Sequence, residues 1–232
     1  MNDPNKVYFV TPIITPNASA DRTGLAYFTV GRTKIYRTSD AGTFWATIGE
    51  SGKNGIGAAR LMRAGNHPVG VSTIDTDHVG VVCNGGFLLL TQDGGATWTE
   101  KPLIAMVPGW AGFNSNVAFA GHSVLYVSSE NPGSTAIRVV KSTDGGATFA
   151  AATAGLPNVP VTKLLVSPKD PSGNTVYAST WIGVYRTTNG GASWTLFGNA
   201  MPQVVVSDLY LPPDGSLLRA STYGRSVWEY RF

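Results

Sequence analysis

Four related octapeptides contain the most regularly spaced acidic residues of this 232-residue chain. They read TSDAGTFW, TQDGGATW, STDGGATF and TTNGGASW, and they occupy residues 38–45, 91–98, 142–149 and 187–194. If their carboxylates are catalytic, the chain is an enzyme with repeated sites. If the octapeptides direct folding, the function lies elsewhere. The last octapeptide favours folding, because Asn189 replaces the aspartate and a catalytic carboxylate would not survive that exchange.

Each residue type of the octapeptide has a direct role in a turn. The aspartate side chain can accept backbone N–H bonds from the residues that follow it, and asparagine keeps this ability. The second glycine allows a positive φ, and the aromatic residue can insert between neighbouring sheets. We therefore interpret the octapeptides as structural hairpins. The residues concerned are Asp40, Gly42, Trp45, Asp93, Gly95, Trp98, Asp144, Gly146, Phe149, Asn189, Gly191 and Trp194.

The remaining residues with metal-binding or nucleophilic side chains are few. Cys83 is the only cysteine, so no disulfide can form within the chain, and its apolar surroundings in VGVVCNGG indicate a buried, inert thiol. His67, His78 and His122 fall in different repeats without metal-ligand spacing. We expect no metal site and no cofactor.

Composition excludes several broad classes of function. Only 13% of the residues are charged, the formal charge is +3, and no run of Lys or Arg exceeds two residues, which argues against nucleic-acid binding. No apolar stretch reaches the ~18 residues of a membrane span. The opening residues MNDPNKVYFV show no signal-peptide pattern, so we expect any export signal to be absent from this sequence.

The octapeptides mark a repeat whose size is typical of a β-propeller blade. Their marker residues are separated by 53, 51 and 45 residues, and each repeat contains about four short strand-like runs. The last unit, residues 204–232, supplies three strands. KVYFVTP, residues 6–12, is expected to add the outer strand of that blade or the inner strand of the first. We predict one all-β domain over 1–232, a propeller of about five four-stranded antiparallel blades, with a fragment of a six- or seven-bladed propeller as the alternative.

The octapeptides resemble Asp-box repeats, also called bacterial neuraminidase repeats, and the resemblance covers roughly residues 25–232. NTVYASTWIGVYRTTNGGASW and DGSLLRASTYGRSVWEY are similar to bacterial sortilin-like and xyloglucanase-like propellers. The resemblance implies a propeller in an extracellular or periplasmic protein, but no particular activity, because these repeats occur in sialidases, xyloglucanases, assembly factors and sorting receptors. The chain lacks the Arg-Ile-Pro segment of sialidases and has no room for the two seven-bladed propellers of such xyloglucanases. We therefore assign no catalytic residue to this chain from its resemblance to those enzymes.

Propeller geometry sorts the loops onto two faces. The octapeptides share one face with the hairpins that join the first and second strands of each blade, and the resemblance implies that ligands bind the other face. That other face should be net positive and carry exposed aromatic side chains, which suits an anionic or carbohydrate ligand. Its candidate ligand-binding residues are Arg60, Arg63, Trp110, Trp181, Tyr223 and Arg225. Structural alternatives are packing between blades for Trp181 and bonding to loop carbonyls for Arg225.

Three functions follow as hypotheses. The first is a non-catalytic binding or scaffold propeller of an exported bacterial-type protein, which presents loops to a polysaccharide, glycan or protein partner. The second is a glycoside hydrolase or part of one, although only Glu50, Glu130 and Asp208 are available there as the required pair of carboxylates. The third is a designed or excised fragment without a ligand. We expect a monomer, with a dimer through open blade edges as the alternative.

Overall fold

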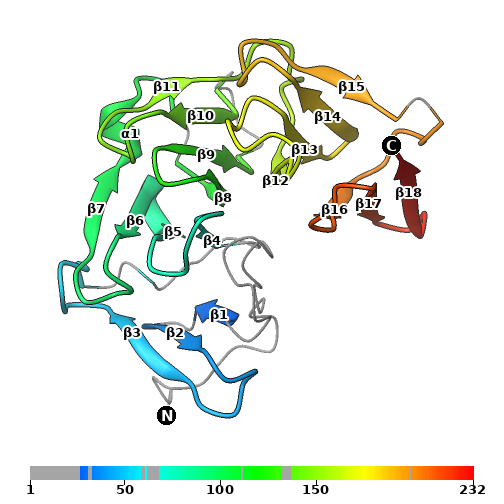
Figure 1. Cartoon of the computed structure of the whole chain (residues 1–232). Helices are drawn as coiled ribbons and strands as arrows, with labels where there is room; N and C mark the ends of the chain where they lie inside the picture. Colours follow the sequence, from blue (N-terminus) through cyan, green and yellow to red (C-terminus); the bar gives the residue numbers. More distant parts are fainter. Residues whose placement is uncertain are drawn as a thin grey trace.

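The chain folds into five antiparallel sheets that follow one another around an open arc (Figure 1). A computed structural model describes residues 27–30, 33–58, 61, 68–110, 112–131, 137–198 and 200–232. Within these residues there are 18 β-strands and only two short helical segments, η2 (Asn84–Gly86) and α1 (Leu103–Met106). This arrangement confirms the predicted all-β propeller architecture.

The three middle sheets have four strands each, and the strands of each sheet are neighbours in the order of the chain. The second sheet contains β4 (Val69–Val71), β5 (Val79–Cys83), β6 (Phe87–Thr91) and β7 (Thr99–Pro102). The third contains β8 (Asn114–Ala120), β9 (Val124–Ser129), β10 (Val139–Ser142) and β11 (Ala150–Ala151). The fourth contains β12 (Val161–Val166), β13 (Val176–Thr180), β14 (Gly183–Thr187) and β15 (Thr195–Phe197).

The first and last sheets have three strands each among the described residues. The first contains β1 (Tyr27–Val30), β2 (Lys34–Thr38) and β3 (Ala46–Glu50). The last contains β16 (Val206–Tyr210), β17 (Leu217–Thr222) and β18 (Val227–Arg231), as expected for a final repeat that supplies three strands. Residues 6–12, predicted to complete one of these two sheets, lie outside the described part. Five blades and a piece of a larger ring both remain compatible with this arrangement.

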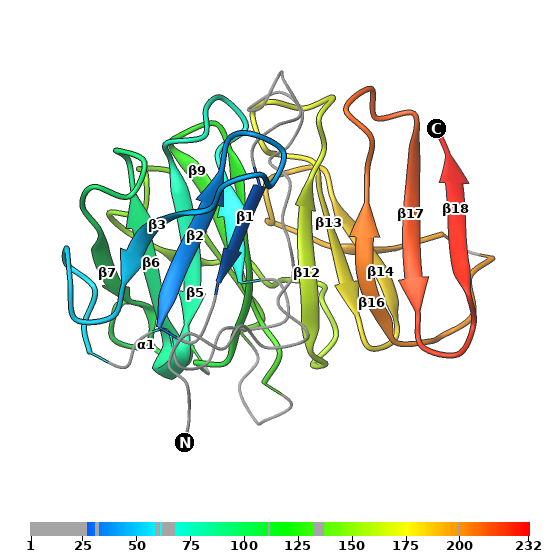
Figure 2. The same ribbon diagram turned by 90° about the horizontal axis from the view of Figure 1, so that it is seen from below.

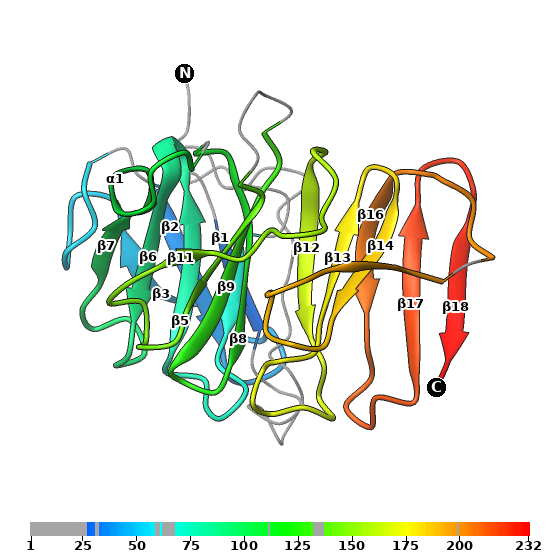
Figure 3. The ribbon, with the colours of Figure 1, turned by 90° about the horizontal axis from the view of Figure 1, so that it is seen from above.

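The hairpins and connections lie at two opposite ends of the strands (Figures 2 and 3). We call the end with the octapeptides the octapeptide face. The hairpins between the first and second strands share it, as shown by backbone bonds from Gly94 N–H to the Asp77 carbonyl and from Gly190 N–H to the Asn174 carbonyl. We call the other end the connection face. It carries α1 and the β17–β18 hairpin, which lie at the same end of the strands in both views.

Apolar side chains fill the space between each pair of successive sheets. Four core clusters follow the four sheet-to-sheet contacts, and each draws buried residues from two neighbouring sheets. Buried hydroxyl groups add hydrogen bonds between the inner strands. Ser115 Oγ donates to the Val161 carbonyl at 2.6 Å, and Thr162 Oγ1 donates to the Val206 carbonyl at 2.7 Å. Because a buried carbonyl requires a donor, these bonds tie the inner strands of adjacent sheets together.

The octapeptides form the expected turns, and the same bonds recur in each of them. In the second, the Thr91 hydroxyl donates to Asp93 Oδ1 at 2.7 Å and accepts the Gly95 N–H at 2.9 Å. Asp93 Oδ1 also accepts the Thr97 N–H at 2.9 Å. Hydrogen bonds from the hydroxyl and the backbone N–H of Thr97 lower the pKa of Asp93 to about 2. The second glycines all have positive φ, from 86° to 99°.

Asn189 preserves the turn without the charge, as predicted. Its Oδ1 accepts the Thr187 hydroxyl at 2.8 Å and the Ser193 N–H at 2.9 Å, while its Nδ2 donates to Ser193 Oγ at 2.8 Å. The last bond replaces the hydroxyl-to-carboxylate bond of the aspartate versions. A neutral hydrogen-bond acceptor is therefore sufficient to form the turn at this position.

The four octapeptide aromatics differ in burial. Trp98 and Trp194 are 4% and 3% exposed, and their indole N–H groups donate to the carbonyls of Ile48 and Ala152 in the preceding sheets. Phe149 is half-buried against the second and third sheets. Trp45 is also only half-buried, contrary to the expectation of insertion between sheets.

Candidate ligand-binding surface

Trp181 and Tyr223 occupy equivalent positions in adjacent sheets on the connection face. Each follows the last residue of the second strand of its sheet, Thr180 in β13 and Thr222 in β17. Each also donates its backbone N–H to the segment that precedes the inner strand, at the Pro160 carbonyl for Trp181 and at the Val205 carbonyl for Tyr223. The repeat therefore places two aromatic side chains at matching hairpin tips.

The two hairpins are held by matching threonine hydroxyls. Thr180 Oγ1 donates to the Gly183 carbonyl at 2.8 Å, and Thr222 Oγ1 donates to the Ser226 carbonyl at 2.6 Å. Ser226 has a positive φ of 62°, which closes the longer β17–β18 hairpin. These bonds lie within each hairpin and fix its backbone. They involve neither the aromatic rings nor the Arg225 side chain.

Both aromatic rings are open to solvent. Trp181 is 47% exposed and Tyr223 is 72% exposed, so the alternative in which Trp181 packs between blades is wrong. Arg225 is exposed in the same hairpin as Tyr223, and its carbonyl accepts the indole N–H of Trp228 at 2.9 Å. We call Trp181, Tyr223 and Arg225 the hairpin-tip surface. Exposed large aromatic side chains are typical of a binding surface.

Trp110 does not belong to this surface, and its prediction as an exposed ligand-binding aromatic is wrong. Its side chain is only 3% exposed and lies in the core between the second and third sheets. Its indole N–H donates to Asn114 Oδ1 at 2.8 Å, and Asn114 Nδ2 in turn donates to the Phe87 carbonyl at 2.9 Å. The irregular sequence around Trp110 suggested a loop, but that loop folds inward. Arg60 and Arg63 lie outside the described residues.

Several charged side chains of the described residues are paired or buried. Lys53 Nζ lies 3.0 Å from Glu50 Oε2, and Lys163 forms an ion pair with Asp208. Arg138 is fully buried, where it donates to the Asn131 carbonyl and to Asn158 Oδ1, and desolvation lowers its pKa. Two of the candidate carboxylates, Glu50 and Asp208, therefore have cationic partners.

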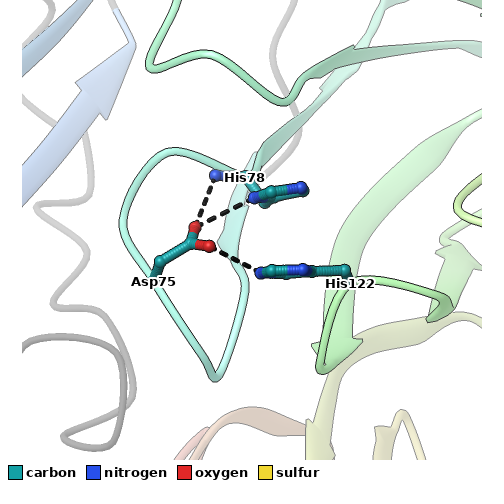
Figure 4. A group of neighbouring side chains, drawn as sticks. All are labelled: Asp75, His78 and His122. Atoms are coloured by element: carbon teal, nitrogen blue, oxygen red, sulfur yellow. Dashed lines mark hydrogen bonds and ion pairs between the residues drawn. The ribbon is translucent and has the colours of Figure 1, made fainter.

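A second group of functional side chains was missed by the sequence analysis. Asp75, His78 and His122 lie together on the octapeptide face, with their ligand atoms within 4.8 Å of one another (Figure 4). The expectation that the histidines are too scattered to meet is wrong for these two, because adjacent sheets bring their hairpins side by side. A recurrence of His at matching hairpins of consecutive repeats was the available signal. Cys83 is buried, as predicted.

The chain matches solved propeller structures at the level of fold. A GH74 enzyme from Niastella koreensis superposes with a TM-score of 0.72 and 17% identity, over 97% of this chain and 36% of that chain. YCF48 bound to D1 peptide gives a TM-score of 0.60 and 18% identity, over 97% of this chain and 70% of that chain. The extracellular domain of a putative one-component system from B. thetaiotaomicron gives a TM-score of 0.59 and 12% identity, over 96% of this chain and 26% of that chain.

These likenesses lie below the identity at which activity can be transferred, and the chain spans only about a third of the length of the GH74 enzyme. No known protein family matches the sequence, and no curated protein matches it either. No helix within the described residues has the length and apolarity to cross a membrane. The comparisons therefore establish a propeller fold.

Proposed function

We propose that this chain is a non-catalytic binding propeller of an exported protein and that its hairpin-tip surface binds a polysaccharide. The observation that carries the proposal is the placement of Trp181 and Tyr223, 47% and 72% exposed, at equivalent tips of adjacent sheets. Successive sugar units of a polysaccharide present repeated apolar faces, and aromatic rings repeated along a surface can stack on them. Arg225 adds a guanidinium that can bind a carboxylate through two parallel hydrogen bonds.

The proposal of a non-catalytic role is supported by the partners of two of the three candidate acids. Hydrolysis of a glycosidic bond requires two carboxylates about 5 to 9.5 Å apart that are free to exchange protons with the substrate. Asp208 is paired with Lys163, and Glu50 is paired with Lys53. The octapeptide aspartates are committed to turns on the opposite face. Placement outside the cytoplasm is part of the proposal and is supported by the likeness to an extracellular propeller domain.

Binding is tested by affinity electrophoresis and calorimetry with a neutral β-glucan and a polyuronide. Trp181→Ala and Tyr223→Ala should each weaken binding about tenfold, since the loss of one stacked ring corresponds to about 1.4 kcal/mol. Arg225→Ala should weaken binding of the polyuronide more than that of the neutral glucan. Phe44→Ala is the matched control, because Phe44 is 69% exposed but lies in the first octapeptide on the opposite face.

A reducing-sugar assay on the same polysaccharides separates binding from hydrolysis. Binding without release of reducing ends supports the proposal. Release of reducing ends would make the chain a glycoside hydrolase or part of one. Polysaccharide binding that is unchanged in both aromatic variants, or no binding to either polymer, would overturn the assignment of the hairpin-tip surface.

A further inference from the structure

We propose that Asp75, His78 and His122 form a binding site for a divalent transition-metal ion of the zinc class, which links the second and third sheets. Asp75 and His78 lie in the β4–β5 hairpin, and His122 lies in the β8–β9 hairpin of the next sheet. Two imidazole nitrogens and one carboxylate are the ligand types that zinc takes in proteins, and three protein ligands leave a position for water.

The ligand atoms already lie close to the spacing that such an ion requires. His78 Nδ1 is 3.0 Å from Asp75 Oδ1, and His122 Nε2 is 2.6 Å from Asp75 Oδ2. Bonds of about 2.0 to 2.2 Å in tetrahedral geometry place ligand atoms about 3.3 Å apart. The three ligand atoms therefore lie together, within 4.8 Å of one another, and Figure 4 shows both rings directed at the same carboxylate.

Asp75 is held in place by backbone hydrogen bonds. Its Oδ1 accepts the backbone N–H groups of Asp77 and His78, both at 3.0 Å. A fixed, charged carboxylate between two imidazoles is the arrangement that a divalent cation favours.

The two hairpins are fastened to each other beside the cluster. Ser72 Oγ donates to the Gly121 carbonyl at 3.0 Å, and the Gly121 N–H donates to Thr73 Oγ1 at 2.7 Å. His122 directly follows Gly121, so these two bonds position its side chain opposite the β4–β5 hairpin. The approach of ligands from two different sheets is therefore built into the fold and does not depend on chance contact of mobile side chains.

The imidazole rings must tilt when an ion binds. In the structure they are stacked with centroids 3.6 Å apart and planes within 8° of parallel. Imidazole lone pairs lie in the ring plane, so an ion midway between these rings would lie about 1.8 Å from each plane. Rotation about the side-chain torsions opens the stack and lets both nitrogens converge. The side chains of His78 and His122 are 19% and 37% exposed, which leaves room for this rotation and gives the ion access from solvent.

The fourth sheet offers a natural comparison. Its β12–β13 hairpin is two residues longer than the β4–β5 hairpin, and it has Asp170 three residues after Ser167, as Asp75 lies three residues after Ser72; Asp170 Oδ2 accepts the Thr175 N–H at 2.7 Å. Thr175 occupies the position of His78, because Ser167 N–H bonds to the Thr175 carbonyl as Ser72 N–H bonds to that of His78. A hairpin at the equivalent place in the fourth sheet thus uses an aspartate turn without a histidine.

The test is calorimetry of the untagged chain with zinc chloride, together with visible absorption spectra of the cobalt(II) chloride complex. We expect one ion per chain and a cobalt spectrum typical of four-coordinate geometry. Asp75→Asn keeps the turn acceptor and removes the charge, and it should weaken zinc binding at least tenfold, as should His78→Ala and His122→Ala. Asp170→Asn, the matched control, should leave zinc affinity within about twofold of the parent.

Nuclear magnetic resonance of the imidazole nitrogens gives a second readout that does not depend on variant stability. Addition of zinc chloride to the parent chain should shift the ring signals of His78 and His122 together. No zinc binding by the parent, binding that persists unchanged in the three ligand variants, or a shift confined to one of the two rings would overturn the proposal.

Discussion

Replacement of Gly95 by alanine tests how closely the octapeptides pack on the preceding sheet. Gly95 has a φ of +99°, and a Cβ atom there would lie 2.3 Å from the Ile48 carbonyl oxygen and 2.7 Å from the Ile48 Cβ atom. The left-handed backbone costs an alanine about 1 to 2 kcal/mol. Overpacking against backbone of the neighbouring sheet adds about 1 to 3 kcal/mol. Gly95→Ala should therefore lower the free energy of unfolding by about 2 to 5 kcal/mol.

Gly42→Ala in the first octapeptide is the matched control. Gly42 occupies the same turn position with a φ of +92°, but the nearest atom to its added Cβ would be 3.8 Å away. This variant should lose only the backbone component, about 1 to 2 kcal/mol. Urea unfolding followed by tryptophan fluorescence measures both changes, with equal m-values as the condition for comparison. Equal destabilisation by the two substitutions would refute the close packing of the second octapeptide on Ile48.

Four further substitutions test the packing and the turns by the same unfolding assay. Thr162→Val removes the donor to the Val206 carbonyl and should cost about 1 to 3 kcal/mol. Trp98→Ala should cost about 3 to 5 kcal/mol, and Trp45→Ala clearly less, because Trp45 is only half-buried. Asp93 has a folded pKa of about 2, below the value of about 3.9 in unfolded chains, so its stabilising contribution is present above pH 4 and is lost as the pH falls through 2. Asp93→Asn should flatten the decrease of the urea midpoint over that range, and an unchanged decrease would contradict the assignment.

The candidate binding surface was only partly predictable from the sequence. Trp181 and Tyr223 follow strands at matching points of two repeats, so the period alone placed them at the same kind of hairpin. Trp110 lies in a segment without periodicity, between the second and third sheets. Its burial depends on Asn114 and on core residues contributed by both sheets, and no local pattern encodes those contacts.

The octapeptide turns could be read from the sequence because their hydroxyl, acid and glycine lie within five residues and interact with one another. Such local bonds form wherever the same residues recur, which is why Asn189 makes the turn that Asp93 makes. The burial of Trp98 and the meeting of His78 with His122 required the tertiary structure. These side chains contact partners more than 40 residues away, and only the packing of one sheet against the next decides which of them come together.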